Sequence, residues 1–145
     1  MMRTTLVRVA FGLTVLAAPV AAPAATLITE SEAALPAAAG GVTMRGITRG
    51  PTIKLVNPAE IKAPFDLKVA FEPHGGAVIE PGSLKVTYLK SPAVDITERV
   101  KPFTSAAGID MAKAEIPAGQ HAIRFDVKDS EGRSGSVTVQ LTVSK

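Results

Sequence analysis

The chain contains no cysteine and no tryptophan, and its aromatic residues, one Tyr and five Phe, make up 4% of 145 residues. Without cysteine the chain cannot form a disulfide framework, so its stability has to come from a hydrophobic core. So few aromatic rings nearly exclude the stacking platforms that bind single-stranded nucleic acid. Hydrophobic residues make up 46% of the chain and charged residues 20%. This balance indicates one small globular domain rather than a disordered chain.

Residues 1–24 have the pattern of a secretory signal peptide. Arg3 and Arg8 give a positive start, residues 9–18 form an apolar run, and Ala22-Pro23-Ala24 matches the small-residue cleavage rule. The apolar run is half of the roughly 20 residues that a membrane-spanning helix needs, which disfavours the alternative of an uncleaved anchor. No cysteine is available for lipid attachment, and no Arg-Arg pair indicates twin-arginine export. We therefore expect cleavage after Ala24 and a periplasmic or secreted protein.

The basic character of the chain comes mostly from that first segment. The full sequence has 16 Lys and Arg against 13 Asp and Glu, a net charge of +3. Removal of Arg3 and Arg8 leaves 14 basic against 13 acidic residues, and no two basic residues are adjacent. A charge of +1 without a basic patch predicts no binding to nucleic acid, and no membrane insertion is expected after cleavage.

The remaining chain divides by composition at about residue 50. Thr29-x-x-Glu32 matches a capping box, and residues 36–41 are rich in Pro, Ala and Gly. We expect residues 25–50 to be a flexible linker with at most a short helix, and residues 51–145 to be the folded domain.

From Thr52 onward apolar and polar residues alternate, which is typical of antiparallel strands with one buried face. Turn-forming residues separate the runs, among them 73–76, 80–82, 117–119 and 129–132. The alternation predicts strands over residues 52–55, 65–72, 84–88, 123–128 and 136–143.

The segment between residues 89 and 116 is harder to interpret. Ile96 and Val100 are four residues apart, so either a single helical turn or a short crossing strand is consistent with the pattern. Ile109 and Met111 share one parity, whereas Ala112, Ala114 and Ile116 share the other. A bulge would reconcile the two sets, because one extra residue changes the face on which the following side chains lie.

Residues 117–143 resemble the last hairpin of bacterial immunoglobulin-like and fibronectin-III-like modules. A Pro117-Ala-Gly119 turn leads into a strand, and Asp129-Ser-Glu-Gly132 turns into the last strand. The resemblance implies an all-β, antiparallel two-sheet sandwich of about seven strands over residues 51–145. The chain departs from antibody domains because it lacks the Cys pair and the core Trp, and His121 lies near the place of the corner Tyr. We expect His121 to point inward and to donate to a backbone carbonyl.

Two motifs bear on hydrolysis. His74-Gly-Gly-Ala77 is superficially similar to an esterase oxyanion loop, but Gly132-Arg-Ser-Gly135 misses the nucleophile-elbow spacing by one residue. A turn between strands explains residues 74–76 fully. No carboxylate pair suited to acid–base chemistry can be identified, so we expect no enzymatic activity.

Metal binding has few candidate residues. His74 and His121 are the only histidines, and Met44 and Met111 are far apart in the sequence. Imidazole and thioether are ligands that copper prefers, so a copper carrier of the CopC type is the alternative function, although the expected mature N-terminus has no histidine.

Calcium is a weaker candidate at the last turn, where Asp126, Asp129 and Glu131 lie close together in the sequence. Their spacing departs from an EF-type loop, and a capping role for Asp129 in the turn is the simpler interpretation. We therefore assign no catalytic, cofactor-binding or metal residues and no cofactor.

These expectations favour an exported, non-enzymatic binding module of the cell envelope. The expected partner is another envelope protein or a surface polymer. The longest predicted loops, residues 73–82 and 89–108, are the expected binding surface, because long loops often carry function. A metal carrier or chaperone that uses His74 or His121 is the alternative, and a soluble hydrolase comes third.

Overall fold

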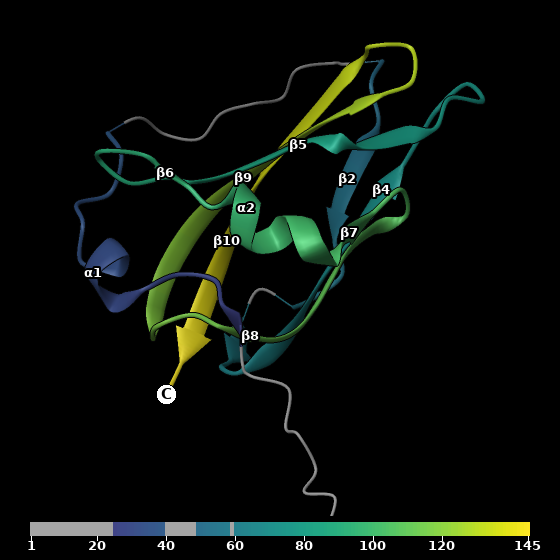
Figure 1. Ribbon diagram of the computed structural model, residues 1–145. Coiled ribbons are helices and arrows are strands. Elements are labelled where there is room, and N and C mark those ends of the chain that lie inside the picture. The colour runs from purple at the N-terminus through teal and green to yellow at the C-terminus, as the bar shows by residue number, and fades with distance from the viewer. Residues whose placement is uncertain (1–24, 40–48, 59) are drawn as a thin grey trace, which may run out of the picture.

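The computed structural model describes residues 25–39, 49–58 and 60–145. The predicted signal peptide and Met44 lie outside the described residues. In the described part the chain is an all-β sandwich of two mixed sheets with two short α-helices and a 3-10 turn (Figure 1). No helix there is both long enough and apolar enough to cross a membrane.

The first sheet has the strand order β1-β8-β4-β2, with β7 also paired to β8. Its strands are β1 (Ala25–Thr26), β2 (Thr52–Leu55), β4 (Phe65–Glu72), β7 (Thr104–Ser105) and β8 (Gly108–Glu115). β1 runs parallel to β8, and the other pairs in this sheet are antiparallel.

The second sheet has the order β3-β10-β9-β5-β6. Its strands are β3 (Glu60–Lys62), β5 (Ile79–Tyr88), β6 (Val94–Asp95), β9 (Gly119–Asp129) and β10 (Ser134–Ser144). β3 runs parallel to the end of β10. β9 and β10 form a central hairpin, and their antiparallel pairing is continuous from the pair Lys128–Ser134 to the pair Gly119–Val143.

The alternation of apolar and polar residues locates the long strands correctly. In β4, Leu67, Val69 and Phe71 are buried, whereas Lys68 between them is exposed. The predicted strands at 52–55, 65–72, 84–88, 123–128 and 136–143 are confirmed as β2, β4, part of β5, part of β9 and part of β10. Side chains from both sheets meet in one core, in which Phe125 and Tyr88 are among the largest fully buried residues.

The bulge predicted in β8 is present. Ala112 and Lys113 together lie opposite Asp66, so the buried parity changes between Met111 and Ala114. Lys113 has a φ of 52°, and its N–H donates to Asp66 Oδ1 at 3.1 Å.

The turn predicted at residues 80–82 is wrong. Pro81 and Gly82 lie inside β5, within an irregular stretch where Glu80 pairs with Lys128 and Lys85 pairs with Asp126. Ser83 occupies the gap, because its hydroxyl donates to the Glu80 carbonyl and accepts from the Lys128 N–H. The Ser83 hydroxyl therefore contacts the Lys128 backbone where the regular pairing of β5 with β9 is interrupted.

Residues 89–108 are not one long loop. They contain β6, helix α2 (Thr97–Val100), the 3-10 turn η1 (Lys101–Phe103) and β7. The helical alternative is confirmed, because residues 97–100 form α2 with Ile96 as the N-cap residue. Ile96 and Val100 are both fully buried. Thr97 fixes the helix to the sheet, accepting from the Val86 N–H at 2.9 Å.

The linker expected between residues 25 and 50 is wrong for its first half. Residues 25–37, here called the N-terminal strap, start as β1 and continue through helix α1 (Glu30–Ala33) to a bridge between Ala37 and Lys90. Leu27 and Ile28 are each 1% exposed and belong to the core. Figure 1 shows the strap in purple and blue, passing from β8 to α1. The capping box is present, with Thr29 and Glu32 each accepting from the other's backbone N–H.

Candidate functional site

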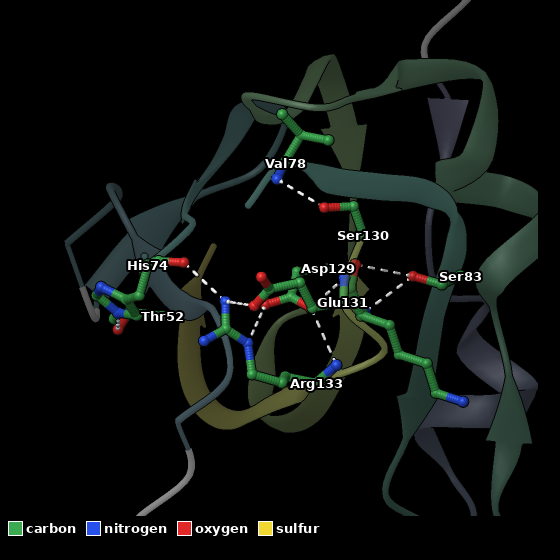
Figure 2. A network of polar contacts seen from close by, with 9 residues as sticks. Thr52, His74, Val78, Ser83, Asp129, Ser130, Glu131 and Arg133 are labelled. Atoms are coloured by element: carbon green, nitrogen blue, oxygen red, sulfur yellow. Dashed lines mark hydrogen bonds and ion pairs between the residues drawn. The ribbon is translucent and has the colours of Figure 1, made fainter. Parts of the chain in front are cut away.

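One end of the sandwich is closed by a polar network centred on Asp129, at the turn between β9 and β10 (Figure 2). Asp129 is fully buried, and its carboxylate accepts from the backbone N–H groups of Glu131 and Arg133 and from Arg133 Nε at 2.9 Å. Burial raises the pKa of the Asp129 carboxyl, but these hydrogen bonds lower it by more, so the pKa is below its ordinary value. The predicted capping role of Asp129 is confirmed.

The same network fixes the turn between β4 and β5. Arg133 donates to the His74 carbonyl at 2.8 Å, and the His74 ring contacts the Thr52 hydroxyl at 2.8 Å. Gly75 and Gly76 follow with φ of 66° and 75°, which glycine adopts without strain. His74 therefore belongs to a turn, as predicted.

We expect Asp129→Asn to lower the melting temperature by roughly 5–10 °C, because Arg133 loses its charged partner inside the protein. Glu131→Gln is the matched control: Glu131 also pairs with Arg133, but its side chain is 57% exposed. Thermal unfolding followed by circular dichroism compares the two variants. Equal melting temperatures would show that the buried carboxylate is not needed.

The other end of β9 contains the second histidine. His121 is 3% exposed, with Nε2 at 2.7 Å from the Pro117 carbonyl and Nδ1 at 2.8 Å from the Tyr88 hydroxyl. A carbonyl only accepts, so Nε2 bears the proton and Nδ1 accepts from Tyr88. Both predictions, that His121 points inward and that it donates to a carbonyl, are confirmed. Neither ring nitrogen retains a free lone pair for a metal.

The surroundings of His121 favour its neutral form. Burial lowers the pKa of His121 below its ordinary value of 6.5, the hydrogen bond to Pro117 opposes this, and the nearby charge of Lys90 adds to the lowering. Lys90 Nζ lies 5.4 Å from the centre of the Tyr88 ring and donates to the Ala33 carbonyl of the strap.

We expect the free energy of unfolding to fall between pH 7.5 and pH 5.5. A lowered pKa means that the unfolded chain takes up the proton first, so stability is full above about pH 6.5 and declines as the pH falls toward the folded-state pKa of His121. In His121→Gln this decline becomes smaller, whereas His74→Gln, which removes an exposed imidazole, retains it. Urea unfolding at both pH values measures the difference. A metal-dependent rise in melting temperature that disappears in His121→Gln would contradict the structural role.

An ion pair fixes the strap to the rest of the sandwich. Arg99 on α2 contacts both carboxylate oxygens of Glu32, at 2.6 and 2.7 Å, and donates to the Leu27 carbonyl at 2.9 Å. The hydrogen bonds from Arg99 lower the pKa of Glu32. Burial raises it, and the hydrogen bonds from Thr29 lower it further, so that the pKa is about 2. The pair therefore contributes its full stability above about pH 4.5 and loses it as the pH falls toward 2.

Beside the strap lies an open groove of about 440 Å³, here called the end groove. Three segments distant in sequence form it: the strap, the turn between β3 and β4, and the connection from β8 to β9. Its lining residues are Thr26, Ile28, Thr29, Glu30, Ala63, Pro64, Glu115, Ile116 and Pro117. The end groove adjoins the His121 region, because Pro117 both lines it and accepts from His121.

Neither loop predicted as a binding surface contributes to the end groove. Residues 73–82 are fixed by the Asp129 network and β5, and residues 89–108 form α2 and short strands. One sequence signal could have revealed the strap. Ile28 precedes the Thr29 cap, and an apolar residue at that position commonly packs against the fourth residue of the helix, here Ala33.

The other predicted site residues are separated or already paired. His74 and His121 lie near opposite ends of β9, and eight residues of strand between positions 121 and 129 span roughly 26 Å. Among the described residues no three His, Asp or Glu side chains gather as a metal cluster. Met111 is fully buried in the core.

The carboxylates considered for calcium are paired within the protein. Asp126 pairs with Arg124 at 2.9 Å and contacts Ser136, while Asp129 and Glu131 both pair with Arg133. Three further comparisons, with protein-family models, with curated proteins and with solved structures, find no match to the chain.

Proposed function

We propose that the protein is an exported, non-enzymatic binding module of the cell envelope with an immunoglobulin-like fold, and that it binds another envelope protein through the end groove. The observation that carries the proposal is the groove itself, a hollow of about 440 Å³ with apolar walls formed by three segments of the chain. Apolar hollows with a few polar groups are the usual form of binding sites.

The strand order supports the immunoglobulin-like part of the proposal. Each sheet matches one sheet of that fold in its strand order. The A-B-E-D strands correspond to β2-β4-β8-β7, and the G-F-C strands correspond to β10-β9-β5. The first strand is divided between the sheets, because β2 pairs with β4 and β3 pairs with β10. Export is supported by the pattern of residues 1–24 alone.

Site-specific photocrosslinking in intact producing cells tests the function. A photoreactive amino acid replaces Thr26 in the end groove or, as the matched control, Gln140, which is exposed on β10. We expect a discrete adduct with an envelope protein from position 26 and none from position 140. Equal labelling from both positions, or none from position 26, would contradict the proposal.

Mass spectrometry of the same preparation tests export. Cleavage after Ala24 gives a chain that starts at Ala25. An intact Met1 in the membrane fraction would contradict the proposed localisation.

A further inference from the structure

The ionisable side chains of the end groove are acidic. Glu30 and Glu115 are exposed, and among the described residues they are the only ones with an ionisable side chain in the lining; cleavage after Ala24 would add the α-amino group of Ala25, next to Thr26 of the lining. Neither carboxylate pairs with a basic side chain in the part of the chain that the structure describes. The other acidic residue of α1, Glu32, is bound to Arg99, so Glu30 is the carboxylate that the strap leaves for a ligand.

The apolar residues that line the groove are all aliphatic. Ile28 and Ile116 are buried in the core below the groove, and the rings of Pro64 and Pro117 add surface without an N–H donor. Such walls favour apolar side chains, and the carboxylates repel an anionic polymer. A volume of about 440 Å³ suits the side chains of a short peptide segment.

From this complementarity we infer that the end groove binds a short segment of a partner protein that carries a lysine or arginine beside apolar residues. The apolar side chains contact Ala63 and the rings of Pro64 and Pro117, and the cation lies between Glu30 and Glu115. The inference rests on the proposed function and specifies its ligand class.

The groove can bind such a segment only while the strap is docked on the sandwich. The strap supplies one wall of the groove, formed by Thr26, Ile28, Thr29 and Glu30. Glu30 is two residues from Glu32, which is paired with Arg99. Loss of that ion pair is therefore expected to weaken ligand binding although neither Glu32 nor Arg99 lines the groove.

The test is selection of phage-displayed random heptapeptides on the mature protein, followed by affinity measurements on the selected peptides. We expect enrichment of Lys or Arg beside Val, Ile, Leu, Pro or Ala. Combined Glu30→Gln and Glu115→Gln should raise the Kd of a selected peptide roughly 3- to 10-fold, and added salt should weaken wild-type binding. Glu80→Gln, an exposed carboxylate on β5, is the matched control and should leave the Kd unchanged.

A second pair of variants tests the location. Thr26→Trp places a large ring in the end groove and should abolish binding, whereas Gln140→Trp on β10 should not. All variants should retain the wild-type melting temperature, because the five replaced positions are exposed.

Selection of peptides without basic residues, recovery of no binding peptide, or equal binding by Thr26→Trp would overturn the inference. So would occlusion of the groove by a second copy of the protein, seen as dimerisation that Thr26→Trp prevents. If crosslinking from position 26 succeeds while the charge variants have no effect, the proposed function stands and the ligand class is wrong. If position 26 gives no adduct, the proposed function itself fails.

Discussion

Replacement of both Leu27 and Ile28 by alanine is expected to lower the free energy of unfolding by about 4–8 kcal/mol, since each truncation of a buried aliphatic side chain costs about 2–5 kcal/mol. Both residues are 1% exposed and lie between β8 and the Arg99 side chain that fixes the strap. This loss is comparable with the whole stability of a typical domain, about 5–15 kcal/mol.

Urea unfolding of the mature protein measures the effect, with the two single variants as a fallback if the double variant does not fold. Val56→Ala is the matched control, because Val56 is a large aliphatic residue that is 61% exposed. If the double variant were as stable as the control, residues 25–37 would be the linker that composition alone predicts.

Phe125→Ala is expected to cost about 3–5 kcal/mol, the usual range for truncation of a buried phenylalanine. Phe125 is 1% exposed on β9, the central strand of its sheet, and Phe71→Ala on β4 should cost a similar amount. Lys68→Ala, on the outer face of β4, should change stability by less than about 0.5 kcal/mol.

Chemical denaturation of the three variants checks this expectation. Similar losses for Lys68→Ala and Phe71→Ala would mean that the assignment of inner and outer faces in β4 is wrong.

The sequence predicts the parts of this fold whose signals are local. Alternation in β4 and β9 locates the inner faces, and the parity change between Met111 and Ala114 locates the bulge in β8. Thr29 and Glu32 predict the cap of α1, because a capping box involves only four adjacent residues.

The sequence does not predict features that depend on distant partners. Pro81 and Gly82 form a turn in most contexts, but here Ser83 and the Lys128 backbone hold them inside a strand. The end groove was missed because Glu30, Pro64 and Ile116 come together only after the sheets have packed. The docking of the strap has no local signal of this kind, because one of its anchors, the Glu32–Arg99 pair, joins residues 67 positions apart.

The position of β1 has a consequence for the proposed cleavage after Ala24. Ala25 and Thr26 pair with Ala114 and Glu115, and the Leu27 N–H donates to the Glu115 carbonyl at 3.0 Å. A protease cuts a chain that is locally unfolded, so the bond before Ala25 is accessible only while β1 is undocked. If the chain is cleaved after Ala24 as proposed, processing therefore competes in time with folding: a chain that docks its strap early would protect this bond, and a chain that docks it slowly would be cut.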